Sequence, residues 1–212
     1  MNKKLFAVLC IAVLVLSFAS ARVANFSIGP SFGTFSGKAP IDDDGHTVNY
    51  KGNGFGVDTT LSFNFNDKAE LYIQDSFLFS GKSFYPDYEI ADNFFKSSLH
   101  YTSIVGFEYA VVTDPVKLSV GGGFAVEILY STYEMASITY MPMVVNFGFD
   151  ATVKAEFELG KSWSLYVKTN ADFVPGTVFV NADSTESEDK KAYAAATGNF
   201  SFAASAGIVV FF

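Results

Sequence analysis

The sequence predicts an all-β fold, an eight-stranded antiparallel up-and-down β-barrel that spans a membrane. Along eight segments, apolar residues alternate with small or polar ones with a period of two, as in strands whose two faces meet unlike environments. Three short turns and four longer loops join these segments in strict alternation, as in barrels with turns at one rim and long loops at the other. No helical period and no shift of composition interrupts the pattern.

The N-terminal segment is predicted to be a secretory signal peptide. Two lysines precede a short apolar run, and Ala19 and Ala21 form an A-x-A cleavage site. We expect cleavage after Ala21. This divides the chain into a leader, residues 1–21, and a single barrel domain, residues 22–212.

Charge and cysteine content limit the functions of the mature chain. Loss of Lys3 and Lys4 with the leader changes the formal net charge from −8 to −10. An acidic, exported chain has no electrostatic basis for binding nucleic acid. The only cysteine, Cys10, lies in the leader, so the mature chain is predicted to have no disulfide and no cysteine metal site.

The first predicted strand, residues 23–35, places Phe26, Ile28 and Phe32 on one face. Pro30 lacks an N–H, which predicts a bulge or a local break in pairing. A polar loop, residues 36–52, follows.

Three more strands are predicted at residues 54–65, 69–80 and 96–112, joined by a tight turn at 66–68 and an aromatic-rich loop at 81–95. Asp75 is the one charged residue on their apolar face. Because a charge at mid-depth in lipid is costly, we expect either that a bulge turns Asp75 inward or that it lies near a membrane interface.

The same alternation predicts the last four strands. These are residues 117–130, 143–158, 163–173 and 193–212, with turns at 113–115 and 159–162 and loops at 131–142 and 175–192.

Alternation alone does not show which face points inward, because a soluble lipocalin-like lipid carrier alternates too. Here the polar face holds nearly all strand charges and is rich in Gly, Ser and Thr, which suits the narrow interior of eight strands. Aromatic residues near strand ends suit the two membrane interfaces. These are Phe65, Tyr109, Tyr130, Phe157 and Trp163. The apolar face is therefore predicted to meet lipid.

The last strand carries a sorting motif. Ser205, Gly207, Val210 and Phe212 are spaced as S-x-G-x-x-V-x-F, which resembles the C-terminal β-signal of bacterial outer-membrane barrels. Val210 departs from that family, which usually has an aromatic residue there. The resemblance implies outer-membrane localisation, a lipid environment, and the barrel assembly machinery and periplasmic chaperones as partners.

Taken as a whole, the mature chain resembles the small eight-stranded outer-membrane proteins of the OmpW, OmpX and OmpA-barrel type. The resemblance implies a non-enzymatic barrel without cofactor or metal. Its role would be a narrow channel for small solutes, apolar ones included, or a structural and surface protein whose loops contact a solute or a surface ligand.

Ten ionisable residues are predicted on the inward face. They would either line a polar conduit or form a paired charge network that fills a closed lumen, and we favour the network because eight strands rarely leave an open pore. The ten are Asp58, Glu70, His100, Glu108, Glu127, Asp150, Lys154, Glu156, Lys168 and Asp172. Turn positions predict that Lys154 lies near Lys168, and Glu127 near His100.

Catalysis and metal binding have weak support. His100, Thr102 and Glu108 resemble the catalytic trio of lipid A deacylase barrels, but that family has serine where Thr102 stands, and Glu108 lies roughly 20 Å further along the strand. A lipid-modifying enzyme therefore remains the alternative. The acidic residues 42–44 lack the spaced ligands of a calcium loop, so no metal site is predicted.

Overall fold

Residues that alternate in the sequence form strands in the structure. The structure is a computed structural model, and it describes residues 24–40, 47–80, 84–85, 95–135, 138–183 and 191–212. The strands within these ranges are β1 (Ala24–Pro40), β2 (Thr47–Asn64), β3 (Ala69–Ser80), β4 (Phe84–Tyr85), β5 (Phe95–Val112), β6 (Lys117–Met135), β7 (Ile138–Glu158), β8 (Trp163–Asp183) and β9 (Lys191–Phe211).

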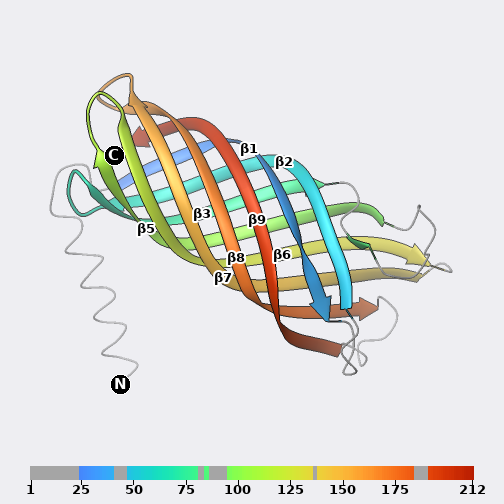
Figure 1. Cartoon of the computed structure of the whole chain (residues 1–212). Coiled ribbons are helices and arrows are strands. Elements are labelled where there is room, and N and C mark those ends of the chain that lie inside the picture. Colours follow the sequence, from blue (N-terminus) through green and yellow to red (C-terminus); the bar gives the residue numbers. More distant parts are fainter. Residues whose placement is uncertain (1–23, 41–46, 81–83, 86–94, 136–137, 184–190) are drawn as a thin grey trace, which may run out of the picture.

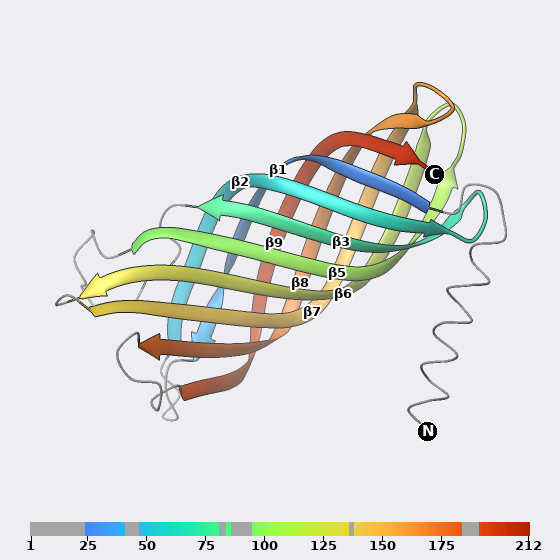
Figure 2. The same cartoon turned by 180° about the vertical axis from the view of Figure 1, so that it is seen from behind.

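The eight long strands close into an antiparallel ring. Its hydrogen-bonded order is β1-β9-β8-β7-β6-β5-β3-β2, and β2 pairs with β1 to complete it. The two-residue strand β4 pairs with β2 on the same edge as β3, beyond the end of β3. Figures 1 and 2 show the resulting barrel, with the short turns and the C-terminus at one end and the long connections at the other. The predicted eight-stranded up-and-down barrel is confirmed.

Strand stagger fixes the width of the barrel. Following paired residues around the ring from Ala24 by way of Phe63 leads back to β1 at Thr34, ten residues further along. A stagger of this size in eight strands tilts them by about 40°, and the interior is then just wide enough for side chains.

The strands are longer than the sequence predicts at the long-loop end. β1 runs to Pro40 and β2 starts at Thr47, so much of the predicted loop 36–52 is strand. The predicted loops 131–142 and 175–192 are also shortened, because β6, β7, β8 and β9 extend into them. These loop boundaries were wrong because the polarity of the two faces changes there.

The inner and outer faces follow the predicted alternation through most of the barrel. Phe26, Ile28 and Phe32 are exposed on the outer face of β1, and the alternate residues Ser27, Gly29 and Ser31 are buried. Toward the long-loop end of β1 the pattern inverts: the outer residues become Ser36 and Lys38, and apolar residues turn inward. The outer face is therefore an apolar belt beneath a polar collar.

Pro30 produces a local break without a bulge. The β1–β9 ladder omits Gly29 and Pro30 but resumes in the same register at Ser31, and pairing with β2 is continuous. Phe65, Tyr109, Phe157 and Trp163 are exposed on the outer surface, as predicted, whereas Tyr130 is half-buried. The predicted leader, with its Ala19–Ala21 cleavage site, and the acidic residues 42–44 lie outside the described residues.

Candidate functional site: the barrel interior

All ten ionisable residues predicted on the inward face are buried in the barrel. Their relative exposures range from 1 to 7%. They come from β2, β3, β5, β6, β7 and β8, so most of the ring contributes a charge to the interior. The arrangement has two polar layers and one apolar layer, which follow one another from the short-turn end to the long-loop end.

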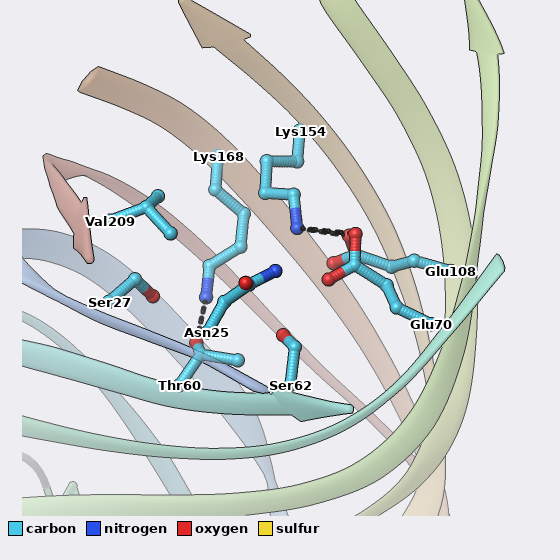
Figure 3. Close-up of a pocket in the computed structure, with 9 residues that line it drawn as sticks. All are labelled: Asn25, Ser27, Thr60, Ser62, Glu70, Glu108, Lys154, Lys168 and Val209. Atoms are coloured by element: carbon cyan, nitrogen blue, oxygen red, sulfur yellow. Dashed lines mark hydrogen bonds and ion pairs between the residues drawn. The ribbon is translucent and has the colours of Figure 1, made fainter. Parts of the chain in front are cut away.

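The first polar layer is an ion-pair cluster around Lys154. Its Nζ lies 2.6 Å from Glu108 Oε2 and 3.2 Å from Glu70 Oε1, and Lys117 Nζ lies 3.0 Å from the same Glu70 oxygen. Figure 3 shows Lys154 reaching from β7 across the lumen toward the two carboxylates on β3 and β5. Glu156, two residues along β7, is also buried.

Lys168 continues this layer from β8. Its Nζ lies 2.7 Å from Asp58 Oδ1. The same Nζ donates to Thr60 Oγ1 at 2.9 Å (Figure 3). Asp58 also accepts from Gln74 Nε2 at 2.7 Å. Gln74 donates in turn to Asn170 Oδ1 at 3.1 Å, and these two residues stand on β3 and β8, at opposite sides of the ring. Hydrogen bonds thus cross the full width of the lumen.

Tyr72 and Asp150 bridge the barrel at the same level. The Tyr72 hydroxyl donates to Asp150 Oδ2 at 2.9 Å, and Asn170 Nδ2 donates to Asp150 Oδ1 at 2.9 Å. A cavity between Lys154 and Lys168 has a volume of only about 10 Å³. That is the space of about one water molecule.

The second polar layer surrounds Glu127. His100 Nε2 lies 3.7 Å from Glu127 Oε2, and the same oxygen accepts from Asn146 Nδ2 at 3.1 Å. The Ser201 hydroxyl lies within hydrogen-bond distance of the other Glu127 oxygen and, at 2.9 Å, of Asp172 Oδ2, and its single O–H donates to one of them at a time. Asn146 also donates to the Tyr50 hydroxyl at 2.8 Å, from the opposite side of the ring.

An apolar layer lies above Glu127, toward the long-loop end. It is joined to the polar layer by Phe35, whose ring stacks on the His100 ring at 4.5 Å. The layer consists of buried residues from β1, β2, β6, β7 and β8, with Tyr193 of β9 packed against them. These are Phe35, Ala39, Tyr50, Leu129, Val144 and Phe179.

The sequence predicted some of these contacts and missed others. Lys154 pairs with Lys168, Asp150 with Asp172, and Thr102 with Glu127, as the turn positions require. Tyr72, Gln74 and Asn170 were not singled out, although each shares the inward face of its strand with the predicted charges. Because their side chains are uncharged, nothing in the sequence distinguished them from other inward-facing polar residues that make no hydrogen bond across the barrel.

His100, Thr102 and Glu108 do not converge. Glu108 pairs with Lys154, whereas the carboxylate nearest His100 belongs to Glu127. No group of three or more His, Cys, Asp or Glu side chains in the described ranges is arranged to hold a metal ion.

The residues of the predicted sorting motif lie on both faces of β9. Ser205 is buried inside the barrel and Phe212 is 70% exposed, with Gly207 and Val210 half-buried between them. Gly207 lies against β1 so closely that a Cβ there would collide with the backbone of Ile28 and Gly29. This motif therefore forms part of the seam that closes the ring.

Asp75 remains on the outer face, so the expected bulge is wrong. β3 keeps an unbroken register with both β2 and β5 around it. Nor does Asp75 end the apolar run, because Ile73 and Phe77 are exposed on either side. The Tyr101 hydroxyl on β5 donates to Asp75 Oδ1 at 2.6 Å, which gives this carboxylate a hydrogen-bond partner on an otherwise apolar face.

Comparison with known proteins relates the chain by structure alone. No protein-family model matches the sequence, and no curated protein matches it. A major outer membrane protein from Thermus thermophilus superposes with a TM-score of 0.58 at 13% identity, over 89% of this chain and 99% of that one. OprG from Pseudomonas aeruginosa gives 0.53 at 11% identity, over 91% and 98%.

Neisserial surface protein A gives a TM-score of 0.51 at 12% identity, over 88% of this chain and 97% of that one. At these identities the likeness establishes the fold. The chain has the fold of small eight-stranded outer-membrane barrels. No helix in the described part of the chain is long and apolar enough to cross a membrane.

Proposed function

We propose that the chain is an integral protein of a bacterial outer membrane, sealed to ions and solutes, that acts at the cell surface through its long-loop end. In this proposal it works without catalysis or cofactor, as a structural or surface-interaction barrel. Outer-membrane lipid surrounds the belt, and the barrel assembly machinery and periplasmic chaperones deliver the exported chain. A narrow solute channel is the function that this proposal sets aside.

The outer face supports the membrane placement. Large apolar side chains cover it around the ring, among them Phe55, Phe124, Phe149 and Phe173, each at least half exposed. A continuous apolar surface of this kind would be unstable in water, and it matches the lipid-facing band of membrane barrels. The three superposed structures are, by their names, outer-membrane or surface proteins.

The filled interior is the observation that carries the sealed function. Lys154 and Lys168 extend into the lumen and meet carboxylates from strands across it, and Gln74 joins Asn170 between opposite walls. Above these bonds the apolar layer around Leu129 fills the barrel again. A conducting path would have to break both the polar and the apolar layers.

Planar-bilayer conductance of the refolded mature protein tests this function. A heat-shift gel confirms that each preparation has formed a barrel. We expect no discrete channels from the wild type. A variant with Glu70, Lys154, Lys168, Leu129 and Phe179 all replaced by alanine should conduct, because it removes side chains that fill both the first polar layer and the apolar layer.

The matched control is Val153→Ala, which alters the lipid-facing neighbour of Lys154 and should leave the bilayer silent. Discrete wild-type channels that weaken on substitution of Lys154 or Lys168 would overturn the sealed function and establish a conduit. A folded but silent multiple variant would mean that the second polar layer, around Glu127, is enough to seal the lumen.

A further inference from the structure

The closing seam of the barrel opens toward the long-loop end. Pairing between β1 and β9 ends at Ser36 and Phe200, yet β1 continues to Pro40 and β9 begins at Lys191. Both strands keep their other partners over this stretch, β2 for β1 and β8 for β9. Each therefore presents a strand edge that no described strand of the ring pairs with.

Asn199 marks the point where the two edges separate. The Lys38 N–H donates to Asn199 Oδ1 at 2.8 Å, and Asn199 Nδ2 donates to the Lys38 carbonyl at 3.2 Å. The side-chain amide thus makes the pair of bonds that a neighbouring strand backbone would make. β9 consequently stands one side chain away from β1 at this level.

A groove of about 790 Å³ occupies the space between these edges. One wall comes from β1 and β2 and includes the exposed Lys38 and Lys51, and the other comes from residues 195–199 of β9. Among the lining residues that the structure describes, two are lysines and none is acidic, although the chain has a net charge of −8. The described walls of the groove are therefore cationic.

The β9 wall has an unusual composition for an exposed edge. Residues 192–198 read A-Y-A-A-A-T-G, without charge or proline. Native edges are generally protected by charges, proline or bulges, because an unpaired edge is a template for another strand. A Cβ placed on Gly198 meets nothing within 4 Å, so there is open space on this face of β9 beside the edge.

From this geometry we propose that the groove binds an extended acidic segment of a partner protein, which adds as a strand to the edge of β9. Backbone hydrogen bonds to β9 supply the affinity, as in other β-strand additions. Carboxylates on alternate residues of the segment face Lys38 and Lys51 on the opposite wall. The seven-residue edge is roughly 20 Å long, which accommodates about six residues of partner.

This site would make the proposed surface function more specific. It rests on that proposed function in one respect, because the partner can reach the groove only if the long-loop end faces outward from the cell. The orientation has its own test. Gly198→Cys should react with a membrane-impermeant maleimide on intact cells, since Cys10 in the predicted leader is the only native cysteine. Absence of labelling on intact cells, with labelling after lysis, would overturn the outward orientation without bearing on strand addition.

Fluorescence anisotropy with the refolded mature protein in micelles tests strand addition. The probe is an end-blocked, labelled eight-residue peptide that alternates valine and glutamate. We expect it to bind, and we expect a peptide with lysine in place of glutamate to bind at least tenfold more weakly. Two further peptides carry N-methyl groups on the odd-numbered or on the even-numbered backbone nitrogens, which blocks one edge of the peptide strand in each case. We expect one of the two to lose binding, and that peptide shows which edge pairs with β9.

Two variants and one control locate the site. Gly198→Trp fills the groove where there is open space and should weaken binding about tenfold, whereas the control Phe202→Trp, on the outer face of the same strand where it pairs with β1, should not. Lys38→Gln with Lys51→Gln should weaken binding and reduce its salt dependence. A heat-shift gel checks that each variant forms a barrel.

Several results would overturn the proposal. Equal binding of N-methylated and unmodified probes would exclude strand addition, and equal binding of the lysine peptide would exclude an acidic partner. Failure of the probe to bind at millimolar concentration would also count against it. If the protein self-associates in the absence of peptide, and Gly198→Trp abolishes this self-association, the occupant of the groove is a second copy of the chain instead.

Discussion

Replacing Lys154 with methionine should destabilise the barrel by about 3–5 kcal/mol, because it removes one partner of a buried ion pair. Lys154 Nζ contacts Glu108 Oε2 at 2.6 Å and Glu70 Oε1 at 3.2 Å, and these side chains are 9% exposed or less. Methionine keeps an unbranched apolar stem, so the change isolates the charge. Glu70 retains Lys117 at 3.0 Å, so most of the cost falls on Glu108.

Urea unfolding in micelles measures this effect, with the fluorescence of Trp163, the only tryptophan, as the signal. The free energy follows from the midpoint at constant slope. The double variant Lys154→Met, Glu108→Gln removes both charges and should recover most of the loss. A loss below about 1 kcal/mol for the single variant would refute a dry, paired interior, since a hydrated lumen would solvate Glu108.

Three further predictions use the same unfolding assay or the heat-shift gel. Gly207→Ala should reduce the folded fraction because its Cβ meets the Ile28 backbone, whereas Gly198→Ala, with open space around it, should fold normally. Tyr101→Phe should cost about 1–2 kcal/mol by leaving Asp75 without its donor, and a smaller cost in an Asp75→Asn background would confirm that reason. Phe179→Ala should cost about 3–5 kcal/mol by opening a cavity in the apolar layer, and an equal cost for the exposed Phe173→Ala would contradict this.

The predicted fold and interior charges follow from local patterns. Alternation along each strand places Lys154 and Asp150 on one face, and the short turn at residues 159–162 places Lys168 and Asp172 opposite them. Both inferences need only the period of a strand and the position of a turn. They therefore succeed without knowledge of how the ring closes.

Contacts across the lumen could not be predicted in that way. The Lys168–Asp58 pair joins β8 to β2, and its level depends on the ten-residue stagger that accumulates around the ring. That stagger is the sum of the register offsets of all eight strand pairs. A one-residue error in the register of any pair therefore misplaces the contact.

The strand ends were misplaced because the surroundings change along each strand. In the belt, apolar side chains lie outside and polar groups lie inside, so Phe32 is exposed and Ser31 is buried. In the collar the rule reverses, and Lys38 is exposed while Ala39 is buried. A search for one constant polar face treats this reversal as a loop, although the backbone continues as a strand.

The seam between β1 and β9 also determines how the chain can reach its folded state. Its ladder joins Asn25 to Phe211, across nearly the whole described chain, whereas most other pairs of long strands adjoin in sequence. Hairpins such as β7–β8 can form early, but ring closure must wait for two remote segments to meet. We therefore expect closure to limit the folding rate, with a transition state in which a curved, open sheet already exists and only the β1–β9 ladder is missing.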